Sequence, residues 1–193
     1  DDFVIQQSSL SFDTSVEEIY PTLITGACLC IIKEGGKDIE SIKKYIVENQ
    51  ATILSTTPIV IDWLNKELSS TGRLRYVISG GDVLYPSSVD YLFERVSIVN
   101  GYGPSEATVA MTYNNINEIS KTSLIGKPID NAKIYILSEH QQLNPVGVTG
   151  DIYIGEVQVA RGYLNLPELN AEKFIFNRFG KETSSRLYRT GDR

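Results

Sequence analysis

Three features of the 193-residue sequence predict an α/β fold, a mixed sheet with crossover helices, followed by a small, mostly β subdomain. Up to about residue 117, apolar strand-like runs alternate with helical stretches, which is the pattern of a sheet with crossover connections. Beyond that point helical runs become rare, and short strands separated by turn residues replace them. No Pro/Gly/Ser-rich linker intervenes, so we expect residues 1–117 to form an α/β subdomain and residues 118–193 an attached β-rich one.

The elements of the first part can be placed in order. Residues 27–32 form an apolar run after Gly26, which is typical of a buried strand. Apolar side chains at helical spacing predict a helix over residues 39–49, and a proline in the first turn predicts helices that begin at Pro58 and Pro86. The other expected strands are residues 51–54, 75–79 and 97–99.

The second part contains fewer elements. Two segments, residues 133–137 and 151–154, are typical of short strands, and turn residues lie between them. Residues 167–173 are the one clear helical stretch.

Composition excludes several classes of function. The sequence has 18 Lys and Arg residues and 24 Asp and Glu residues. This excess of acidic residues argues against a protein that binds nucleic acid through its phosphates. No apolar run approaches the roughly 20 residues of a membrane helix. One histidine, His140, and two cysteines cannot supply the usual four ligands of a zinc site. We expect Cys28 and Cys30 to be buried strand residues in a reducing, cytoplasmic setting.

The segment with the most chemistry is residues 100–106, Asn-Gly-Tyr-Gly-Pro-Ser-Glu, which we expect to be a loop after a strand. Ligands of open α/β sheets bind at that edge. Gly101 and Gly103 allow the backbone to approach a ligand, and Tyr102 offers a flat face for stacking. Glu106 can hold Mg²⁺, and it stands where a Rossmann fingerprint would have its third glycine.

Two further turns carry polar groups. Residues 80–82, Gly-Gly-Asp, end another expected strand at what could be the same edge, although a simple tight turn is the favoured interpretation of these residues taken alone. Residues 190–192, Thr-Gly-Asp, follow an apolar pair, and a carboxylate there could accept both hydroxyls of a ribose.

Several segments in the correct order resemble motifs of the adenylate-forming enzymes. Residues 100–106 resemble their N-x-Y-G-P-T-E motif, and residues 187–192 resemble Y-R-T-G-D. Residues 150–155 and 160–164 together resemble G-E-L-x-I-x-G…A-R-G-Y-L. Residues 11–19 resemble the F-D-x-S segment of the amino-acid-activating branch, the adenylation domains of nonribosomal peptide synthetases. The matches span nearly the whole chain.

The resemblance implies an enzyme in which an amino-acid carboxylate attacks the α-phosphorus of ATP and expels pyrophosphate. The aminoacyl adenylate then passes to the phosphopantetheine thiol of a carrier protein. The implied partners are an amino acid, ATP with Mg²⁺, and the peptidyl carrier and condensation domains of the same synthetase, with neither nucleic acid nor membrane. Tyr102 would stack on adenine, Asn100 would bind its amino edge, and Asp192 would take the ribose hydroxyls. The nucleotide-binding set is Gly80, Gly81, Asn100, Tyr102, Gly103, Ser105 and Asp192, with Glu106 as the Mg²⁺ ligand.

The same matching implies a substrate pocket. Asp13 matches the residue that pairs with the substrate α-ammonium, which fatty-acid and aryl-acid relatives do not need. Glu17 is unusual, because a carboxylate in a small apolar pocket favours a cationic or hydrogen-donating side chain. We therefore expect Arg or Lys as substrate, with Tyr second; the alternative is that Glu17 is a helix-surface carboxylate. The expected pocket residues are Asp13, Thr14, Glu17, Ser55, Ile78, Gly80, Gly101, Val109 and Ala110.

Two departures from the family pattern bear on function. Residues 155–158 read Gly-Glu-Val-Gln where the family often has G-G-x-G, so the turn there can differ. The phosphate loop would precede residue 1, and the subdomain with the catalytic Lys would follow residue 193. We expect this chain to be the later part of the large subdomain of an adenylation domain, with little activity by itself. An acyl- or aryl-CoA ligase, against which Asp13 argues, and a noncatalytic nucleotide-binding module remain as alternatives.

Overall fold

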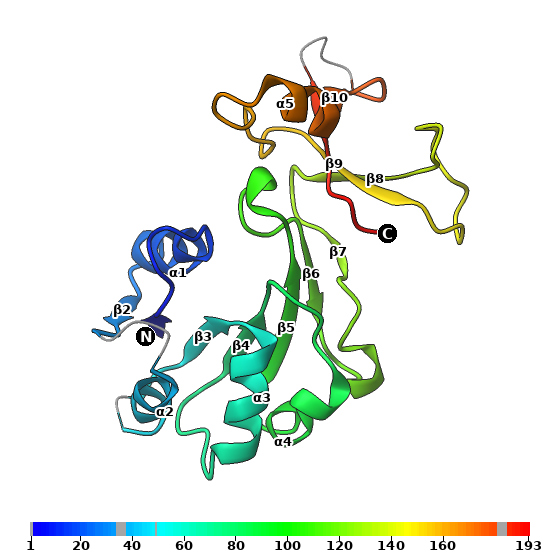
Figure 1. The fold of residues 1–193 in the computed structure, drawn as a ribbon. Helices are drawn as coiled ribbons and strands as arrows, with labels where there is room; N and C mark the ends of the chain where they lie inside the picture. The colour runs from blue at the N-terminus through cyan, green and yellow to red at the C-terminus, as the bar shows by residue number, and fades with distance from the viewer. Residues whose placement is uncertain (1, 34–37, 49, 181–184) are drawn as a thin grey trace. The chain divides into compact units, whose positions relative to one another are not determined.

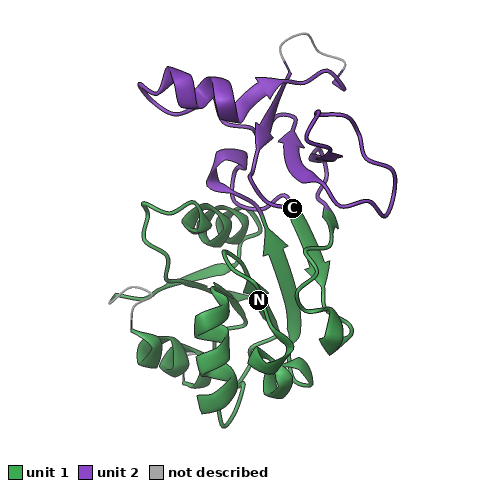
Figure 2. Ribbon diagram, turned by 45° about the vertical axis from the view of Figure 1, so that its right-hand side comes forward, with its two compact units in different colours: residues 1–102, 112–127 green, residues 103–111, 128–193 purple. Residues whose placement is uncertain are grey.

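The computed structural model describes residues 2–33, 38–48, 50–180 and 185–193. The chain forms two compact units (Figure 2). The first consists of Asp1–Tyr102 and Thr112–Lys127, and the second of Gly103–Met111 and Pro128–Arg193. No helix in the described residues is long and apolar enough to cross a membrane.

The first unit is built on a mixed sheet, as the sequence predicts (Figure 1). Among the described residues the strand order is β2-β1-β3-β4-β5-β6-β7. The strands from β2 to β5 pair in parallel, and β6 runs antiparallel to β5. The strands are β1 Phe3–Gln6, β2 Cys28–Ile31, β3 Ile53–Thr56, β4 Tyr76–Ser79, β5 Ser97–Tyr102, β6 Thr112–Asn115 and β7 Lys127–Pro128.

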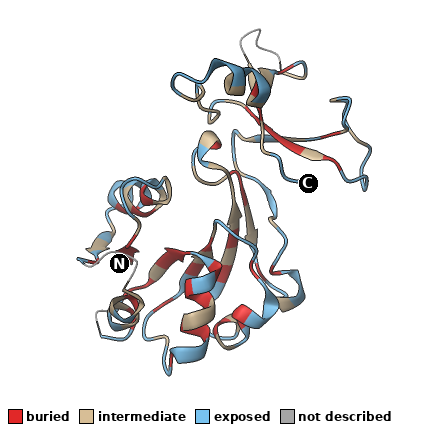
Figure 3. Ribbon diagram, viewed as in Figure 1, coloured by how far each residue is buried: buried red, intermediate tan, exposed pale blue. Residues whose placement is uncertain are grey.

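One face of this sheet is covered by the predicted crossover helices. They are α2 Ile39–Val47, α3 Pro58–Glu67, the 3₁₀ turn η1 Pro86–Ser88 and α4 Asp90–Phe93. Figure 3 shows buried residues along α3 and the adjoining strands. The core contains Ile5, Leu54, Val77 and Ile98 from the strands and Ile42, Ile46, Ile61, Leu64 and Leu92 from the helices. Each such side chain contributes about 1.5–3 kcal/mol through its removal from water.

A helix that the sequence does not signal, α1 Thr14–Ile24, lies on the opposite face. Leu54 and Ser55 are neighbours in β3 and therefore point to opposite faces; Leu54 is in the core, whereas Ser55 contacts α1. The helix reverses the usual amphipathic pattern. Its buried residues are Ser15, Glu18 and Thr22, and its exposed ones include Val16, Tyr20, Leu23 and Ile24.

The second unit is a small antiparallel sheet, which confirms the predicted β-rich part. In the described residues the strand order is β10-β11-β9-β8. Leu137, Tyr153 and Leu187 form its core. The elements are β8 Lys133–Leu137, β9 Asp151–Gly155, α5 Pro167–Lys173, β10 Phe174–Phe176 and β11 Arg186–Arg189.

Four sequence expectations need correction. The strand expected to be buried at residues 27–32 is the edge strand β2, where Cys28 is exposed and Cys30 half-buried. An apolar run cannot distinguish a central strand from an edge strand. The strand expected at residues 51–54 is displaced to Ile53–Thr56, and β5 continues through Tyr102 because Asn100 and Gly101 pair with β6. The expected helix 39–49 ends at Val47, and residue 49 lies outside the described part.

Candidate active site

Four expected pocket residues of the first unit lie on one face of its sheet. Ser55 pairs with Ile78, which pairs with Val99, so these three side chains share a face. Gly80 and Gly101 lie two residues beyond Ile78 and Val99 and therefore continue the same face. The two glycines are adjacent, because a Cβ on Gly80 would lie 3.8 Å from the Gly101 carbonyl oxygen. This is the face that α1 covers.

Glu17 of α1 reaches this face of the sheet. Its Oε2 accepts a hydrogen bond from Ser55 Oγ at 2.9 Å, and its Oε1 accepts one from the Tyr113 hydroxyl at 2.5 Å. Burial and the neighbouring Glu17 charge raise the pKa of Tyr113 far above its ordinary value, so Tyr113 remains a neutral donor. Glu17 is half-buried, and no Lys or Arg of the described residues forms an ion pair with it. This face of the sheet therefore carries a carboxylate that accepts hydrogen bonds from two neutral hydroxyls.

Asp13 and Thr14 stand at the start of α1. Asp13 is the N-cap residue, and its backbone carbonyl accepts a hydrogen bond from Val16 N at 2.8 Å in the first turn. Its side chain makes no capping hydrogen bond, although aspartate commonly does so at this position. The half-buried Asp13 carboxylate is thus not used by the helix and could pair with an ammonium group.

The expected adenine-binding residues follow the alternation of β5. Asn100 and Tyr102 point to the face opposite Gly101, because side chains alternate along a strand. Asn100 is 3% exposed, and its Nδ2 donates to the carbonyl oxygens of Thr122 at 3.0 Å and Leu124 at 3.1 Å. These bonds fix the orientation of the amide, whose oxygen is the atom that could accept a hydrogen bond from an adenine amino group.

Gly81 has a left-handed backbone, with φ at +85°, and a Cβ there would meet nothing within 4 Å. Its glycine requirement is therefore conformational rather than steric.

In the second unit, Gly103 lies directly against the segment that carries Val109 and Ala110. A Cβ on Gly103 would lie 2.4 Å from the Val109 carbonyl oxygen and 2.7 Å from Ala110 Cα, so only glycine fits. Thr108 and Val109 have φ of 65° and 69°. A left-handed conformation is unusual for β-branched residues, and such strain clusters at functional sites.

Glu106, the expected Mg²⁺ ligand, belongs to a cluster with two tyrosines. The Tyr163 hydroxyl donates to Glu106 Oε1 and lies 3.3 Å from the Tyr188 hydroxyl. Burial acts to raise the pKa of Glu106, but hydrogen bonds with Tyr163 and Tyr188 and the nearby Lys173 charge outweigh it, so this pKa lies below its ordinary value. The carboxylate is therefore anionic at neutral pH.

An anionic Glu106 fits the chemistry of Mg²⁺ bound to a nucleotide. Among the described residues no group of three or more His, Cys, Asp or Glu side chains could hold a metal ion. Mg²⁺ commonly takes only one or two carboxylates and completes its shell with phosphates and water. Glu106 would hold the ion, which when bound neutralises charge on the phosphates.

The last two expected nucleotide-binding residues are exposed. Ser105 begins the 3₁₀ turn η2 Ser105–Ala107. Asp192 follows β11, and its backbone N–H donates to Thr190 Oγ1 at 3.0 Å.

Sequence reasoning missed three tyrosines. Tyr163 and Tyr188 lie inside motifs that the sequence does show, so a signal for them exists. Tyr113 has no such signal, because its role depends on the pairing of β6 with β5.

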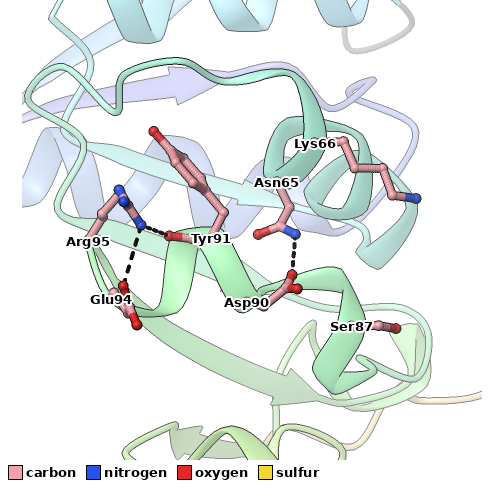
Figure 4. Close-up of a pocket in the computed structure, with 7 residues that line it drawn as sticks. All are labelled: Asn65, Lys66, Ser87, Asp90, Tyr91, Glu94 and Arg95. Atoms are coloured by element: carbon pink, nitrogen blue, oxygen red, sulfur yellow. Dashed lines mark hydrogen bonds and ion pairs between the residues drawn. The ribbon is translucent and has the colours of Figure 1, made fainter.

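A surface depression of about 480 Å³ lies elsewhere in the first unit (Figure 4). Asn65, one of its lining residues, donates a hydrogen bond from Nδ2 to Asp90 Oδ1 at 2.6 Å and accepts one from Leu92 N at 3.0 Å. It contains none of the expected site residues. Its lining consists of Asn65, Lys66, Ser87, Asp90, Tyr91, Glu94 and Arg95.

Residues 1–164 match a family model described as AMP-binding enzyme. The chain belongs to the AMP-binding enzyme family. It is 40% identical to a linear gramicidin synthase protein of Brevibacillus parabrevis over 97% of its length, and 38% identical to bacitracin synthase 2 of Bacillus licheniformis over 99%. It spans only 4% and 7% of those two proteins.

A solved structure aligns with this chain over 98% of its length. It is the N-terminal subdomain of NpsA from Klebsiella oxytoca in complex with 3-hydroxybenzoyl-AMSN, with a TM-score of 0.86 and 26% sequence identity. The alignment covers 48% of that chain. The predicted fold class, part of the large subdomain of adenylate-forming enzymes, is thereby confirmed.

Proposed function

We propose that the protein containing this chain is an amino-acid-activating adenylation enzyme of a nonribosomal peptide synthetase. The family match and the peptide-synthetase relatives support this class. We propose further that the activated amino acid has a cationic side chain, Lys or Arg, with Tyr as the second candidate. The observation that supports this substrate is the Glu17 carboxylate. It lies on the sheet face that carries the expected pocket residues and accepts hydrogen bonds from two neutral hydroxyls.

The proposed chemistry has two steps. A carboxylate oxygen of the amino acid attacks the α-phosphorus of ATP, the bond from that phosphorus to the bridging oxygen breaks, and pyrophosphate leaves with the bonding electrons. A phosphopantetheine thiol of a carrier domain then attacks the acyl carbon, its proton passes to solvent, and AMP leaves. Both steps depend on positioning and on neutralisation of charge.

The residues of this chain would position the reactants. Asp13 would pair with the α-ammonium, and Glu17 would pair with the side-chain cation. Tyr102 would stack on adenine, Asp192 would accept the ribose hydroxyls, and Glu106 would hold Mg²⁺. A half-buried carboxylate is costly without a partner, so a cationic ligand would gain a charge-assisted interaction at Glu17.

A second candidate, activation of an aryl or acyl acid, has one observation in its favour. The NpsA structure holds a 3-hydroxybenzoyl compound. Asp13 weighs against it for this chain, because an aryl acid has no α-ammonium to match that carboxylate.

The test is amino-acid-dependent ATP–pyrophosphate exchange on the full-length protein, with all proteinogenic amino acids and 3-hydroxybenzoate. We expect Lys or Arg to drive the fastest exchange and Glu17→Gly to abolish that preference. Exchange with small apolar amino acids would keep the enzyme class and overturn the substrate. Exchange only with the aryl acid would overturn amino-acid activation itself.

A further inference from the structure

We propose that Tyr113 is a specificity-positioning residue, whose hydroxyl holds the Glu17 carboxylate in the orientation that selects a cationic side chain. This inference rests on the proposed function, since it assigns Glu17 to the substrate pocket. It adds a residue outside the motifs, from a strand that the sequence does not signal.

The position of Tyr113 is set by cross-strand pairing. Tyr113 of β6 is paired with Gly101 of β5, and paired residues point to the same face. A Cβ on Gly101 would lie 2.9 Å from Cε1 and 3.3 Å from Cδ1 of the Tyr113 ring. The ring therefore occupies the space that Gly101 leaves open. Gly101 shapes the pocket by admitting this ring.

The backbone beneath Tyr113 is also fixed. Gly126 packs so closely that a Cβ on it would lie 2.0 Å from the Tyr113 carbonyl oxygen. With both Gly101 and Gly126 against it, Tyr113 has little freedom to move away from Glu17.

The two hydroxyls orient Glu17 without neutralising it. Tyr113 donates to Oε1 and Ser55 to Oε2, so each carboxylate oxygen has one protein donor. A carboxylate oxygen can accept two hydrogen bonds, which leaves acceptor capacity on both oxygens for a ligand. A Lys or Arg partner would have cancelled the charge, whereas neutral donors preserve it. Tyr113 thus fixes the direction of the carboxylate and keeps its charge available.

The test is Tyr113→Phe in the full-length protein, assayed by ATP–pyrophosphate exchange with lysine, arginine and norleucine. We expect KM for the cationic amino acid to rise about tenfold, with kcat and the KM for ATP changed less than twofold. The KM for norleucine, which lacks the cation, should stay constant, so the cation-to-norleucine ratio of kcat/KM should fall about tenfold. The matched control is Tyr45→Phe, which removes a hydroxyl that donates to the Ile31 carbonyl instead; we expect it to leave the ratio unchanged.

The outcomes separate this inference from the proposed function. If the wild type shows no preference for a cationic side chain, the proposed substrate is wrong and this inference falls with it. If the wild type prefers Lys or Arg and Tyr113→Phe keeps the same ratio, the role of Tyr113 is wrong and the proposed function stands. If Tyr113→Phe does not fold, Gly101→Ala decides, because its methyl group displaces the ring: a reduced ratio supports the inference and an unchanged ratio overturns it.

Discussion

Gly126→Ala should destabilise the first unit strongly, because Gly126 meets two steric demands at once. Its φ of +82° lies in the left-handed region, and a Cβ there would lie 2.0 Å from the Tyr113 carbonyl oxygen and 2.6 Å from Asn114 N. Both contacts are with backbone of β6, which cannot turn aside as a flexible side chain could.

The loss of stability can be estimated by treating the backbone conformation and the close contacts of Gly126 separately. A left-handed conformation costs a residue with a Cβ about 1–2 kcal/mol. Forcing a methyl group into filled space costs about 1–3 kcal/mol more. The sum for Gly126→Ala is about 2–5 kcal/mol of unfolding free energy. Gly26 is the matched control: its φ is +74°, but a Cβ there would meet nothing within 4 Å, so Gly26→Ala should cost only the first part, about 1–2 kcal/mol.

The assay is urea unfolding of the full-length protein, followed by tryptophan fluorescence, to which Trp63 of the first unit contributes. We expect the unfolding midpoint of Gly126→Ala to lie well below that of Gly26→Ala. Equal midpoints for the two variants would refute the steric reasoning, because they would show that φ alone determines the cost.

Two further predictions concern single carboxylates. Glu156 has φ of +87° where the family motif often has glycine, so Glu156→Gly should be more stable than Glu156→Ala by about 1 kcal/mol in thermal unfolding; the reverse order would contradict this. Glu18 is 1% exposed, and burial raises its pKa despite hydrogen bonds from Ser8 and Gln6. The folded state therefore binds the Glu18 proton more tightly than the unfolded state, and this contribution to stability is lost as pH rises through the folded pKa. The glutamine of Glu18→Gln cannot ionise, so the unfolding free energy of this variant relative to wild type should rise between pH 4 and pH 7. A difference in unfolding free energy that stays constant with pH would contradict the raised pKa of Glu18.

Apolar periodicity predicted much of the fold, and its failures have a physical cause. The helices that begin at Pro58 and Pro167 were predictable because each carries a proline at its start, and the helix at Pro58 also has apolar residues at helical spacing. The helix α1 was not, because its buried residues Ser15, Glu18 and Thr22 are polar and its exposed side chains are apolar. A sequence pattern locates a helix only where the core side is the apolar side.

The candidate site was predictable only where it coincides with a motif. The matching placed Ser55 and Glu17 in one pocket, and the structure joins them by a hydrogen bond. It could not show that Asn100 and Gly101 face opposite ways, because that depends on the extent of β5. The contact of Tyr113 with Glu17 could not be predicted from the sequence, because the two residues are 96 positions apart and are brought together by strand pairing.

The proposed role of Glu17 is to recognise a side-chain cation. This role can be tested by titration calorimetry, which gives the affinity of the full-length protein for sulfamoyl-adenosine mimics of three aminoacyl adenylates: lysyl, arginyl and norleucyl. A charge-assisted hydrogen bond is worth about 1.5–3 kcal/mol, which corresponds to about 10- to 150-fold in the dissociation constant. We predict that the lysyl or the arginyl mimic binds more tightly than the norleucyl mimic by that factor. Equal affinities, or tighter binding of the norleucyl mimic, would contradict the claim.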